Sequence, residues 1–514
     1  MYDKTTQSLR INNQMSRTFH TYRGVKQGCI LSPKLFNLFI NDLPDIFLDC
    51  QNMCNPISLS EGTKINCLMY ADDLILLSET EEGLQTCLNR LKQYTKKWNL
   101  KLNLKKTKIM VFQNKGKRSS PTFTFGDNIV QTATEYKYLG TVITNTGNFK
   151  LNEIKLKQKG LRASFIISKN ITPYAKTSTS IRLFEKIIEP ILLHNSEISG
   201  AYFPNTWNYE KFVEKIWNIG EELNKVVLGF LRQVLGVHKK SCINAVMAET
   251  GKYPICIKIF TRIIKYWLRA STTDNTLIKS THILNEKRFN DGNPCWTKIV
   301  MFLRRYTNIT NIPSKENSNS ILNQFKKTIR LNYDRWWNNL AKPTGSNKLD
   351  FYYRYKKTFK FENYLDNIPR HIRLHITRLR LSSHSLPIEV QRYRKKDNKI
   401  EREERKCKIC NANATGDEMH YLLECSNAEI CHVREEFLEK IKHKNEQFRN
   451  LSDRNIIDYC MLMTDTSIQM LTAKYAMDIL NIYKEETDGP TITYTPPVET
   501  KSGRKVRKPE KLDL

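Results

Sequence analysis

The first 150 residues alternate between apolar positions with a helical period and short apolar runs typical of strands. Residues 32–43 place their apolar side chains on one helical face, with Ser32 as a cap and Pro33 at the first helical position. A second helix is predicted after Ser78, because Ser78 and Glu81 have the spacing of a capping box and the following apolar residues recur every 3.6 positions.

Short apolar runs separate and follow these two helices. The run 67–77 holds Asp72 and Asp73 between two apolar stretches, and this pattern predicts a tight hairpin. Further strands are predicted at 109–112, 123–125 and 136–143. The first 150 residues therefore predict a mixed fold in which an antiparallel sheet carries helices on one face.

After residue 150 the chain becomes mostly helical. The stretch 351–406 is rich in basic and aromatic residues, with 16 Lys and Arg against 7 Asp and Glu. A cluster of Cys and His follows it, and then amphipathic helices continue to about residue 485. The last thirty residues are basic and have no hydrophobic period, so we expect a disordered tail.

The overall charge narrows the choice of partner. The 514 residues contain 83 Lys and Arg against 52 Asp and Glu, a formal charge of +31. Such an excess favours an anionic polymer, most simply nucleic acid. No apolar run approaches the ~18 residues that a membrane span needs, and the polar N-terminus does not resemble a signal peptide. Most cysteines are scattered singly, as buried thiols are, so we expect a reducing compartment, the nucleus or the cytoplasm.

Asp72 and Asp73 are the most informative polar residues of the chain. Aspartate is depleted in strands, and two ionised carboxylates between apolar strands are costly unless a cation compensates them. Phosphoryl transfer by a two-metal route needs carboxylates that hold two ions ~3.5–4 Å apart. The simpler alternative is a solvated hairpin turn, and the Asp-Asp pair alone would favour it.

The sequence around the pair favours the metal site. Residues 70–73 (YADD), with apolar residues on both sides, resemble the catalytic hairpin of reverse transcriptases. Three other blocks resemble the glutamine-glycine motif, the next palm block and the primer-holding motif of that family: 23–33 (RGVKQGCILSP), 102–112 (LNLKKTKIMVF) and 138–140 (YLG). Their order and style are similar to those of non-LTR (LINE-type) retrotransposons. The likeness extends over roughly 1–440, through 230–236, 249–254 and 379–389.

The resemblance implies a polymerase site with two Mg²⁺ ions. Asp72 would ligate metal directly and Asp73 would support it. The resemblance places beside the template and the incoming nucleotide Gln27, Gly28 and Lys106. It assigns to the primer grip Tyr138, Leu139 and Gly140. The implied partners are an RNA template and a DNA primer or target.

One departure from the family pattern matters. Members of the family carry a further catalytic aspartate on the first palm strand, several tens of residues before the glutamine-glycine motif. Here Arg23 is reached after twenty-two residues, and Asp3 is the one carboxylate before it, in a polar setting. We therefore expect a chain truncated at its N-terminus, without the fingers, the first palm strand or the endonuclease, and catalytically incomplete as given.

A second candidate site is a Cys/His cluster with the spacing C-x2-C-x9-H-x4-C. Three thiolates with one imidazole suit structural zinc, and a similar array closes many LINE-type polymerases. The four ligands would be Cys407, Cys410, His420 and Cys425. Free thiols are the alternative, and Cys431 or His432 could replace the last ligand. The family pattern of residues 418–425 favours Cys425.

Basic residues just before this cluster predict a nucleic-acid surface. They recur at helical spacing and are Arg370, Arg373, Arg378 and Arg380. A solvated helix face is the plain alternative, but the overall charge favours phosphate contact. Tyr353 and Tyr355 could stack on unpaired bases, although aromatic residues at this density more often form a core.

Together these features predict an α+β chain. The predicted domains are an incomplete polymerase palm at 1–150, a helical thumb at 151–270, a helical connection at 271–350, a basic region with a zinc module at 351–440, C-terminal helices at 441–484 and a disordered basic tail at 485–514. The favoured function is part of an RNA-directed DNA polymerase of a LINE-type retrotransposon. The second hypothesis is a nucleic-acid-binding protein without enzymatic activity, which uses the basic region and the zinc module alone.

Overall fold

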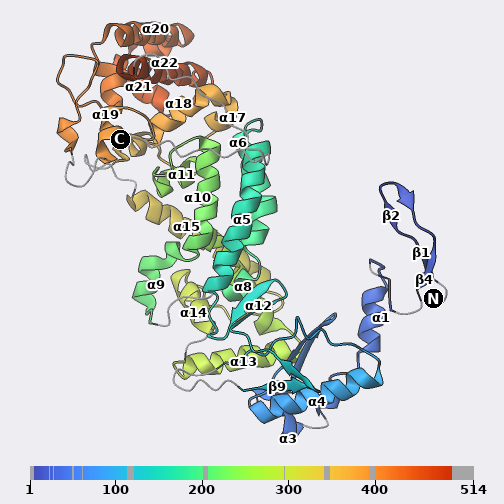
Figure 1. The fold of residues 1–514 in the computed structure, drawn as a ribbon. Helices are drawn as coiled ribbons and strands as arrows, with labels where there is room; N and C mark the ends of the chain where they lie inside the picture. The colour runs from blue at the N-terminus through green and yellow to red at the C-terminus, as the bar shows by residue number, and fades with distance from the viewer. Residues whose placement is uncertain are drawn as a thin grey trace. The chain divides into compact units, whose positions relative to one another are not determined.

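Each of the two units of the computed structural model (Figure 1) is assembled from three separate stretches of the chain. Unit 1 comprises Met1–Lys155, His194–Ile219 and Ile259–Phe325, and unit 2 comprises Leu156–Leu193, Gly220–Lys258 and Lys326–Leu514. The structure describes residues 5–21, 24–26, 28–48, 51–60, 62–112, 121–200, 206–293, 296–340, 348–393 and 400–488. Asp3, Arg23, Gln27 and nearly all of the predicted basic tail lie outside these residues.

The strands of unit 1 form short antiparallel hairpins. Each described strand pairs with a single partner. The pairs are β1 (Thr5–Gln7) with β4 (Phe19–Thr21), β2 (Arg10–Ile11) with β3 (Gln14–Met15), β5 (Ile57–Ser60) with β6 (Thr63–Ile65), β7 (Cys67–Tyr70) with β8 (Asp73–Leu76), β9 (Phe123–Phe125) with β10 (Asn128–Val130), and β11 (Glu135–Tyr138) with β12 (Thr141–Thr144). The prediction that the first 150 residues mix helices and strands is confirmed. The described strands do not, however, form the single sheet that the sequence predicts.

Two of the predicted strands take a different form. The run 136–143 contains a turn at Leu139 and Gly140, whose φ angles of +44° and +84° divide it into β11 and β12. In the predicted strand 109–112, Ile109 makes an isolated bridge to Thr132. The sequence gives no signal of this turn. Leu139 occupies a left-handed position that usually holds glycine or asparagine, but as an apolar residue it continues the apolar run of a strand.

The two predicted helices of unit 1 are present, with different caps. Helix α1 (Ser32–Phe39) has Pro33 in its first turn and ends at Phe39, before the predicted end. Ser32 lies within the helix, and its hydroxyl donates to the carbonyl of Lys26 (2.6 Å). Helix α4 (Glu81–Lys97) is capped by the side chain of Thr80 rather than by Ser78.

Helix α4 organises the hydrophobic core of unit 1. Cys87 and Leu91 on one side of α4 pack with the inward-facing side chains of hairpin β7–β8. Leu88 packs with Phe123 of β9 and Val130 of β10. Because both hairpins bury their apolar side chains against α4, each is stabilised without joining the other in a larger sheet.

The remaining helices of unit 1 are mostly short. They are α2 (Asp45–Leu48), α3 (Gln51–Cys54), α8 (Ser196–Ser199), α9 (Tyr209–Lys215), the 3₁₀ helix η2 (Ile216–Asn218), α13 (Thr276–Asn290) and α14 (Thr297–Tyr306). Three helices contribute residues to both units: α5 (Lys150–Asn170), α12 (Ile255–Thr272) and α15 (Ser318–Leu340).

Unit 2 is built from helices, as the sequence after residue 150 predicts. They are α6 (Thr177–Leu183), the π-helix η1 (Phe184–Ile188), α7 (Glu189–Leu192), α10 (Glu221–Leu235), α11 (Ile243–Glu249), α16 (Asp350–Tyr355), α17 (Tyr364–Asn367), α18 (Arg370–Arg380), α19 (Pro387–Val390), η3 (Gln391–Tyr393), η5 (Arg402–Glu404), the π-helix η6 (His420–Glu424), α20 (Ala428–Lys444), η7 (Glu446–Asn450), α21 (Asp453–Met461) and α22 (Gln469–Asp488). Across the described residues of both units, each helix is too short or too polar to cross a membrane.

A buried ion pair joins α11 to α18 inside unit 2. Arg380 is 1% exposed, and its Nε donates to Glu249 Oε1 (2.9 Å). The Tyr364 hydroxyl donates to the same carboxylate oxygen (2.6 Å). Burial raises the pKa of Glu249, but the charges of Arg380 and Lys356 outweigh burial and lower that pKa below its ordinary value. The carboxylate therefore stays ionised, and its hydrogen bonds tie three helices together.

The substitution Arg380→Met should destabilise unit 2 strongly. Removing one member of a buried pair leaves an uncompensated charge, which costs about 3–5 kcal/mol. Chemical denaturation followed by circular dichroism would measure the decrease in stability. Arg335→Met, at an exposed position on α15, removes the same group and should change stability by less than about 0.5 kcal/mol. Equal effects of the two substitutions would contradict this structural role for Arg380.

Candidate catalytic hairpin and metal centre

The turn of hairpin β7–β8 presents two carboxylates to solvent. Tyr70 pairs with Asp73 across the ladder, so the turn consists of Ala71 and Asp72. Asp72 and Asp73 are both exposed, while apolar residues of both strands pack toward α4. Ala71 has a φ of +53°, which is uncommon for a residue with a side chain. The exposed pair on this turn could hold divalent cations with carboxylate oxygens, the ligands that Mg²⁺ prefers.

The hairpin β11–β12 lies near this turn. The charge of Asp73 acts on the hydroxyl of Tyr138: burial first, and then this carboxylate, raise the pKa of Tyr138. The Tyr136 hydroxyl donates to the carbonyl of Lys106 (3.2 Å), which brings the exposed Lys106 to the same hairpin. The structure thus groups residues from three of the blocks that resemble reverse transcriptase motifs.

Gly28, from the fourth block, has a φ of +85°. A Cβ at this position would meet no heavy atom within 4 Å, so the backbone conformation rather than crowding favours glycine. Its neighbour Gln27 lies outside the described residues.

His194 and Asn195 hydrogen-bond to the turn at Leu139 and Gly140 and to the residue that follows it. His194 Nε2 donates to the carbonyl of Leu139 (3.1 Å). A Cβ on Gly140 would lie 2.6 Å from the same Nε2, so with any other residue the His194 ring would have to move. The amide of Asn195 donates to the hydroxyl of Thr141. These contacts determine where the turn lies within unit 1.

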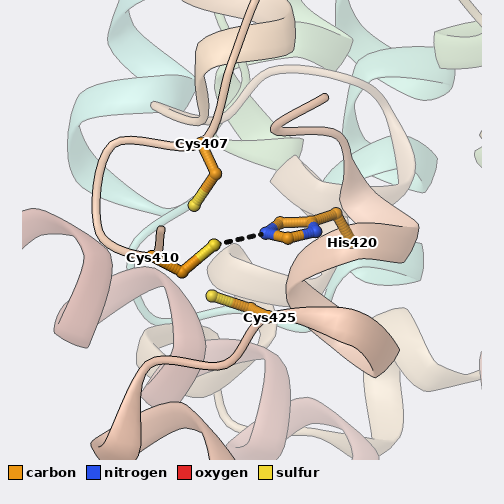
Figure 2. A group of neighbouring side chains, drawn as sticks. All are labelled: Cys407, Cys410, His420 and Cys425. Atoms are coloured by element: carbon orange, nitrogen blue, oxygen red, sulfur yellow. Dashed lines mark hydrogen bonds between the residues drawn. The ribbon is translucent and has the colours of Figure 1, made fainter. Parts of the chain in front are cut away.

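The four predicted metal ligands of unit 2 come together around one point (Figure 2). Their ligand atoms all lie within 4.8 Å of one another, and Cys410 Sγ is 3.4 Å from His420 Nε2. Ligands bound about 2.0–2.3 Å from a tetrahedral ion lie about 3.5–3.8 Å apart, so three thiols and one imidazole at these distances fit zinc. Cys431 lies outside the group, and its thiol donates to the carbonyl of Cys425 (3.4 Å).

Local structure explains how this chain segment forms the cluster. A bridge between Lys406 and Thr415 closes the loop that carries Cys407 and Cys410. A Cβ on Gly416 would lie 3.1 Å from the backbone nitrogen of Cys407, so this residue must be small. His420 begins the π-helix η6, and π-helical turns are frequent at functional sites.

Burial and mutual repulsion make it unfavourable for all three thiols of the cluster to be ionised when no cation is bound. Burial raises the pKa of Cys425 to about 12, and the charges of Cys407 and Cys410 contribute to the increase. Burial also raises the pKa of Cys407, but the nearby Tyr421 hydroxyl and Cys410 thiol and the backbone N–H groups of Ile409 and Cys410 outweigh it and lower the pKa. A divalent cation would remove the repulsion between thiolates, which is the chemistry of a structural zinc site.

The predicted arginine surface is largely a structural element of unit 2. Arg373 is 4% exposed and donates to the carbonyls of Leu365 (2.6 Å) and Val234 (3.3 Å). Arg380 is held by Glu249 as described above. The prediction that these two arginines contact phosphate is therefore wrong, because both lie on the inward face of α18. Arg370 and Arg378 on the same helix are partly exposed.

The aromatic residues before this helix are also internal. Tyr353 and Tyr355 are 6% and 5% exposed, and the Tyr355 hydroxyl donates to Asp458 (2.6 Å). The structure thus contradicts base stacking by these two residues and supports their alternative role in the core.

Comparison with known proteins identifies the N-terminal motifs. Residues 1–143 match the family described as "Reverse transcriptase (RNA-dependent DNA polymerase)". The resemblance to LINE-type reverse transcriptases is confirmed. The matched range contains the hairpins β7–β8 and β11–β12 almost completely, and it ends before the helices of unit 2.

Similar proteins come from non-LTR elements of insects. The "RNA-directed DNA polymerase from mobile element jockey" of Drosophila melanogaster is 25% identical over 189 residues, which are 34% of this chain and 19% of that protein. The "Retrovirus-related Pol polyprotein from type-1 retrotransposable element R2" of Nasonia vitripennis is 31% identical over 160 residues, 29% of this chain and 15% of that protein. The chain thus covers less than a fifth of the length of these relatives.

The residues that hold hairpin β11–β12 in place have no signal in the sequence. His194 and Asn195 lie more than fifty residues after the turn that they contact, and no motif contains them. Gly416 is likewise indistinguishable in the sequence from an ordinary loop glycine. In each case the role comes from a tertiary contact, which local sequence patterns do not encode.

The substitution Gly140→Ala should loosen the turn between β11 and β12. The new Cβ would meet His194 as well as adopt a left-handed φ, so the cost should exceed the roughly 1–2 kcal/mol of backbone strain alone. Gly147→Ala is the matched control, because Gly147 has a φ of +71° but a Cβ there would meet no heavy atom within 4 Å. Hydrogen exchange of residues 135–145 would measure the effect. Equal protection in the two variants would show that the His194 contact does not hold the turn.

Proposed function

We propose that the chain provides the polymerase motifs of an RNA-directed DNA polymerase from a LINE-type retrotransposon. The observation that carries the proposal is the pair Asp72 and Asp73, exposed on a left-handed turn within the residues that match the reverse transcriptase family. Exposed carboxylates would also suit a solvated hairpin turn, and the position of this pair within the matched residues is what favours phosphoryl transfer.

The residues near this turn take distinct roles in the proposal. Asp72 would ligate Mg²⁺ directly and Asp73 would support it; when bound, the ion would stabilise the charge that develops during phosphoryl transfer. The turn of Tyr138, Leu139 and Gly140 seats the primer. Lys106 and Gly28, with Gln27 from the same motif, would contact the nucleotide and the template. The substrates are therefore an RNA template, a DNA primer and deoxynucleoside triphosphates.

The second candidate is a nucleic-acid-binding protein without enzymatic activity. The net charge of +31 and the Cys/His cluster, which lies outside the matched residues 1–143, favour it. Both candidates bind nucleic acid, so binding alone does not separate them. Metal binding at the hairpin does, because only the polymerase needs it.

Cleavage by bound Fe²⁺ tests the proposed function without requiring turnover. With Fe²⁺ in place of Mg²⁺ and ascorbate as reductant, hydroxyl radicals should cut the chain close to the β7–β8 turn. The double variant Asp72→Asn with Asp73→Asn should not show this cleavage, since amides are much weaker ligands for hard cations. Asp127→Asn, at an exposed carboxylate of the same unit, should keep it. Absence of cleavage at the hairpin in the parent chain would favour the non-enzymatic candidate.

We also propose that the cluster in unit 2 binds one structural zinc ion. Its four donors, Cys407, Cys410, His420 and Cys425, complete a tetrahedral set and leave no position for substrate. The ion would hold the loop of Cys407 to helix η6 and thereby organise this end of unit 2.

Metal analysis of the purified chain should find about one zinc per chain, as a closed four-ligand site requires. Cys425→Ser should release most of the zinc, while Cys431→Ser, which changes the neighbouring thiol, should retain it. Removal of the metal by a chelator should lower the unfolding temperature of the parent chain, because binding energy is folding energy in such modules. Absence of zinc from Cys431→Ser but not from Cys425→Ser would contradict the assigned ligand set.

A further inference from the structure

An open groove with a volume of about 580 Å³ is lined by residues of helices α20 and α22 in unit 2. The two helices lie side by side (Figure 1), and the rings of Phe437 and Tyr475 stack between them with their centroids 4.2 Å apart. Asn427, which caps the start of α20, donates from Nδ2 to Oε1 of Glu486 near the end of α22 (3.4 Å). The helices therefore run antiparallel, and the groove lies where α20 begins and α22 ends.

The lining of this groove is acidic, although the chain as a whole is strongly basic. Three carboxylates line it, from Glu429 of α20 and from Asp478 and Glu485 of α22, and the one basic side chain among the described lining residues is His432. Glu429 and Glu485 are exposed, and Asp478 is half-buried. Within the part of the chain that the structure describes, none of these three carboxylates forms an ion pair.

The environment of Asp478 agrees with an excess of negative charge at the groove. Burial raises the pKa of Asp478, and the charge of Glu436 raises it further. Three nearby cations lower this pKa without outweighing burial: Lys440, Lys474 and His375. Lys440 is itself paired with Glu436. A cation placed in the groove would therefore stabilise the ionised carboxylate where the surrounding residues do not.

The groove also has an apolar part. Val433 of α20 is half-buried and Ile482 of α22 is buried, and both line it. Such a mixed lining suits lysine and arginine, because their methylene stems pack on apolar side chains while their charged ends meet carboxylates. Three carboxylates repel phosphate, so nucleic acid does not fit here. The chemistry of the groove thus favours a basic polypeptide segment.

The chain itself supplies such a segment shortly after α22. Residues 501–508 (KSGRKVRK) hold five Lys and Arg and no Asp or Glu. Lys501 lies sixteen residues after Glu485, and a flexible chain of this length spans about 20–24 Å on average. Asp478 and Glu485 lie seven residues apart on α22, which corresponds to about 10 Å along a helix. The segment is therefore long enough to reach back to all three carboxylates.

We propose that the groove between α20 and α22 binds the basic segment 501–508 of the same chain. The three carboxylates pair with its lysines and arginines, and the methylene stems pack on Val433 and Ile482. Exposed ion pairs are individually weak, but linkage within one chain raises the effective concentration of the segment to about the millimolar range. The inference does not rest on the proposed polymerase function, because the groove lies in unit 2 and outside residues 1–143.

Limited digestion of the full chain with trypsin at low salt tests the proposal. Trypsin cleaves after Lys and Arg, so the rate of cleavage within 501–508 measures how often the segment leaves the groove. Glu429→Gln with Glu485→Gln should raise this rate about 2- to 30-fold, since each exposed ion pair favours the bound segment about 1.4- to 5-fold. Both positions are exposed, and circular dichroism should show that the variant keeps the fold of the parent.

A matched control is available on the 3₁₀ helix η5. Glu403 and Glu404 are exposed carboxylates of the same unit and do not line the groove. Glu403→Gln with Glu404→Gln removes the same formal charge and should leave the cleavage rate of the parent unchanged. Equal rates in the two double variants, whether raised or not, would show that the groove does not hold the segment and would overturn the proposal.

Zero-length cross-linking identifies the occupant directly. A carbodiimide joins carboxylates to amines in contact with them, so mass spectrometry of the parent chain should find lysines of 501–508 linked to Glu429, Asp478 or Glu485. In a mixture of isotope-labelled and unlabelled chains, these links should stay within one chain. Links between labelled and unlabelled chains would assign the groove to a second copy, and links from these lysines to other carboxylates alone would place the segment elsewhere. Either result would overturn the proposal.

Discussion

The packing of helix α4 is the constraint on which the candidate catalytic hairpin depends. Cys87 and Leu91 bury the inward side chains of β7 and β8, and the ladder between these strands then leaves the turn at Ala71 and Asp72 outside the core. Asp72 lies in this turn, Asp73 is the first residue of β8, and both are exposed. The apolar face of one helix thus decides that two carboxylates meet solvent side by side.

The packing on α4 is followed along the chain by the hairpin β11–β12. β9 and β10 also pack on α4, and Tyr138 of the following hairpin lies near enough to the β7–β8 turn to be affected by the charge of Asp73. His194 and Asn195 hydrogen-bond to that hairpin. The grouping of Asp73 and Tyr138 therefore arises from the core of unit 1 and from contacts distant in sequence, rather than from a continuous sheet.

Unit 2 uses the same residue type in two different ways. Arg373 and Arg380 are buried and hold helices together through carbonyls and a carboxylate. Arg370 and Arg378 lie on the same helix and also donate to carbonyls, at the C-terminal end of α10, but they are partly exposed. A buried guanidinium must meet all its needs through internal partners, while a partly exposed one also contacts solvent.

The sequence by itself determined the elements whose signals are local. The period of apolar residues located α4, the run around Asp72 and Asp73 predicted their hairpin, and the spacing of Cys407 to Cys425 predicted the cluster. Motif order was sufficient to indicate the reverse transcriptase family, because each motif lies within a few consecutive residues.

Tertiary structure alone decided which polar residues are buried and which hairpins meet. The helical spacing of Arg370, Arg373, Arg378 and Arg380 is the same whether their helix faces solvent or the core, so the sequence could not separate structural from exposed arginines. Likewise, the predicted sheet requires pairing between hairpins, whereas β7 pairs with β8, β9 pairs with β10, and both hairpins obtain burial from α4. Burial depends on what packs against a residue from elsewhere in the chain, and a local pattern carries no information about that partner.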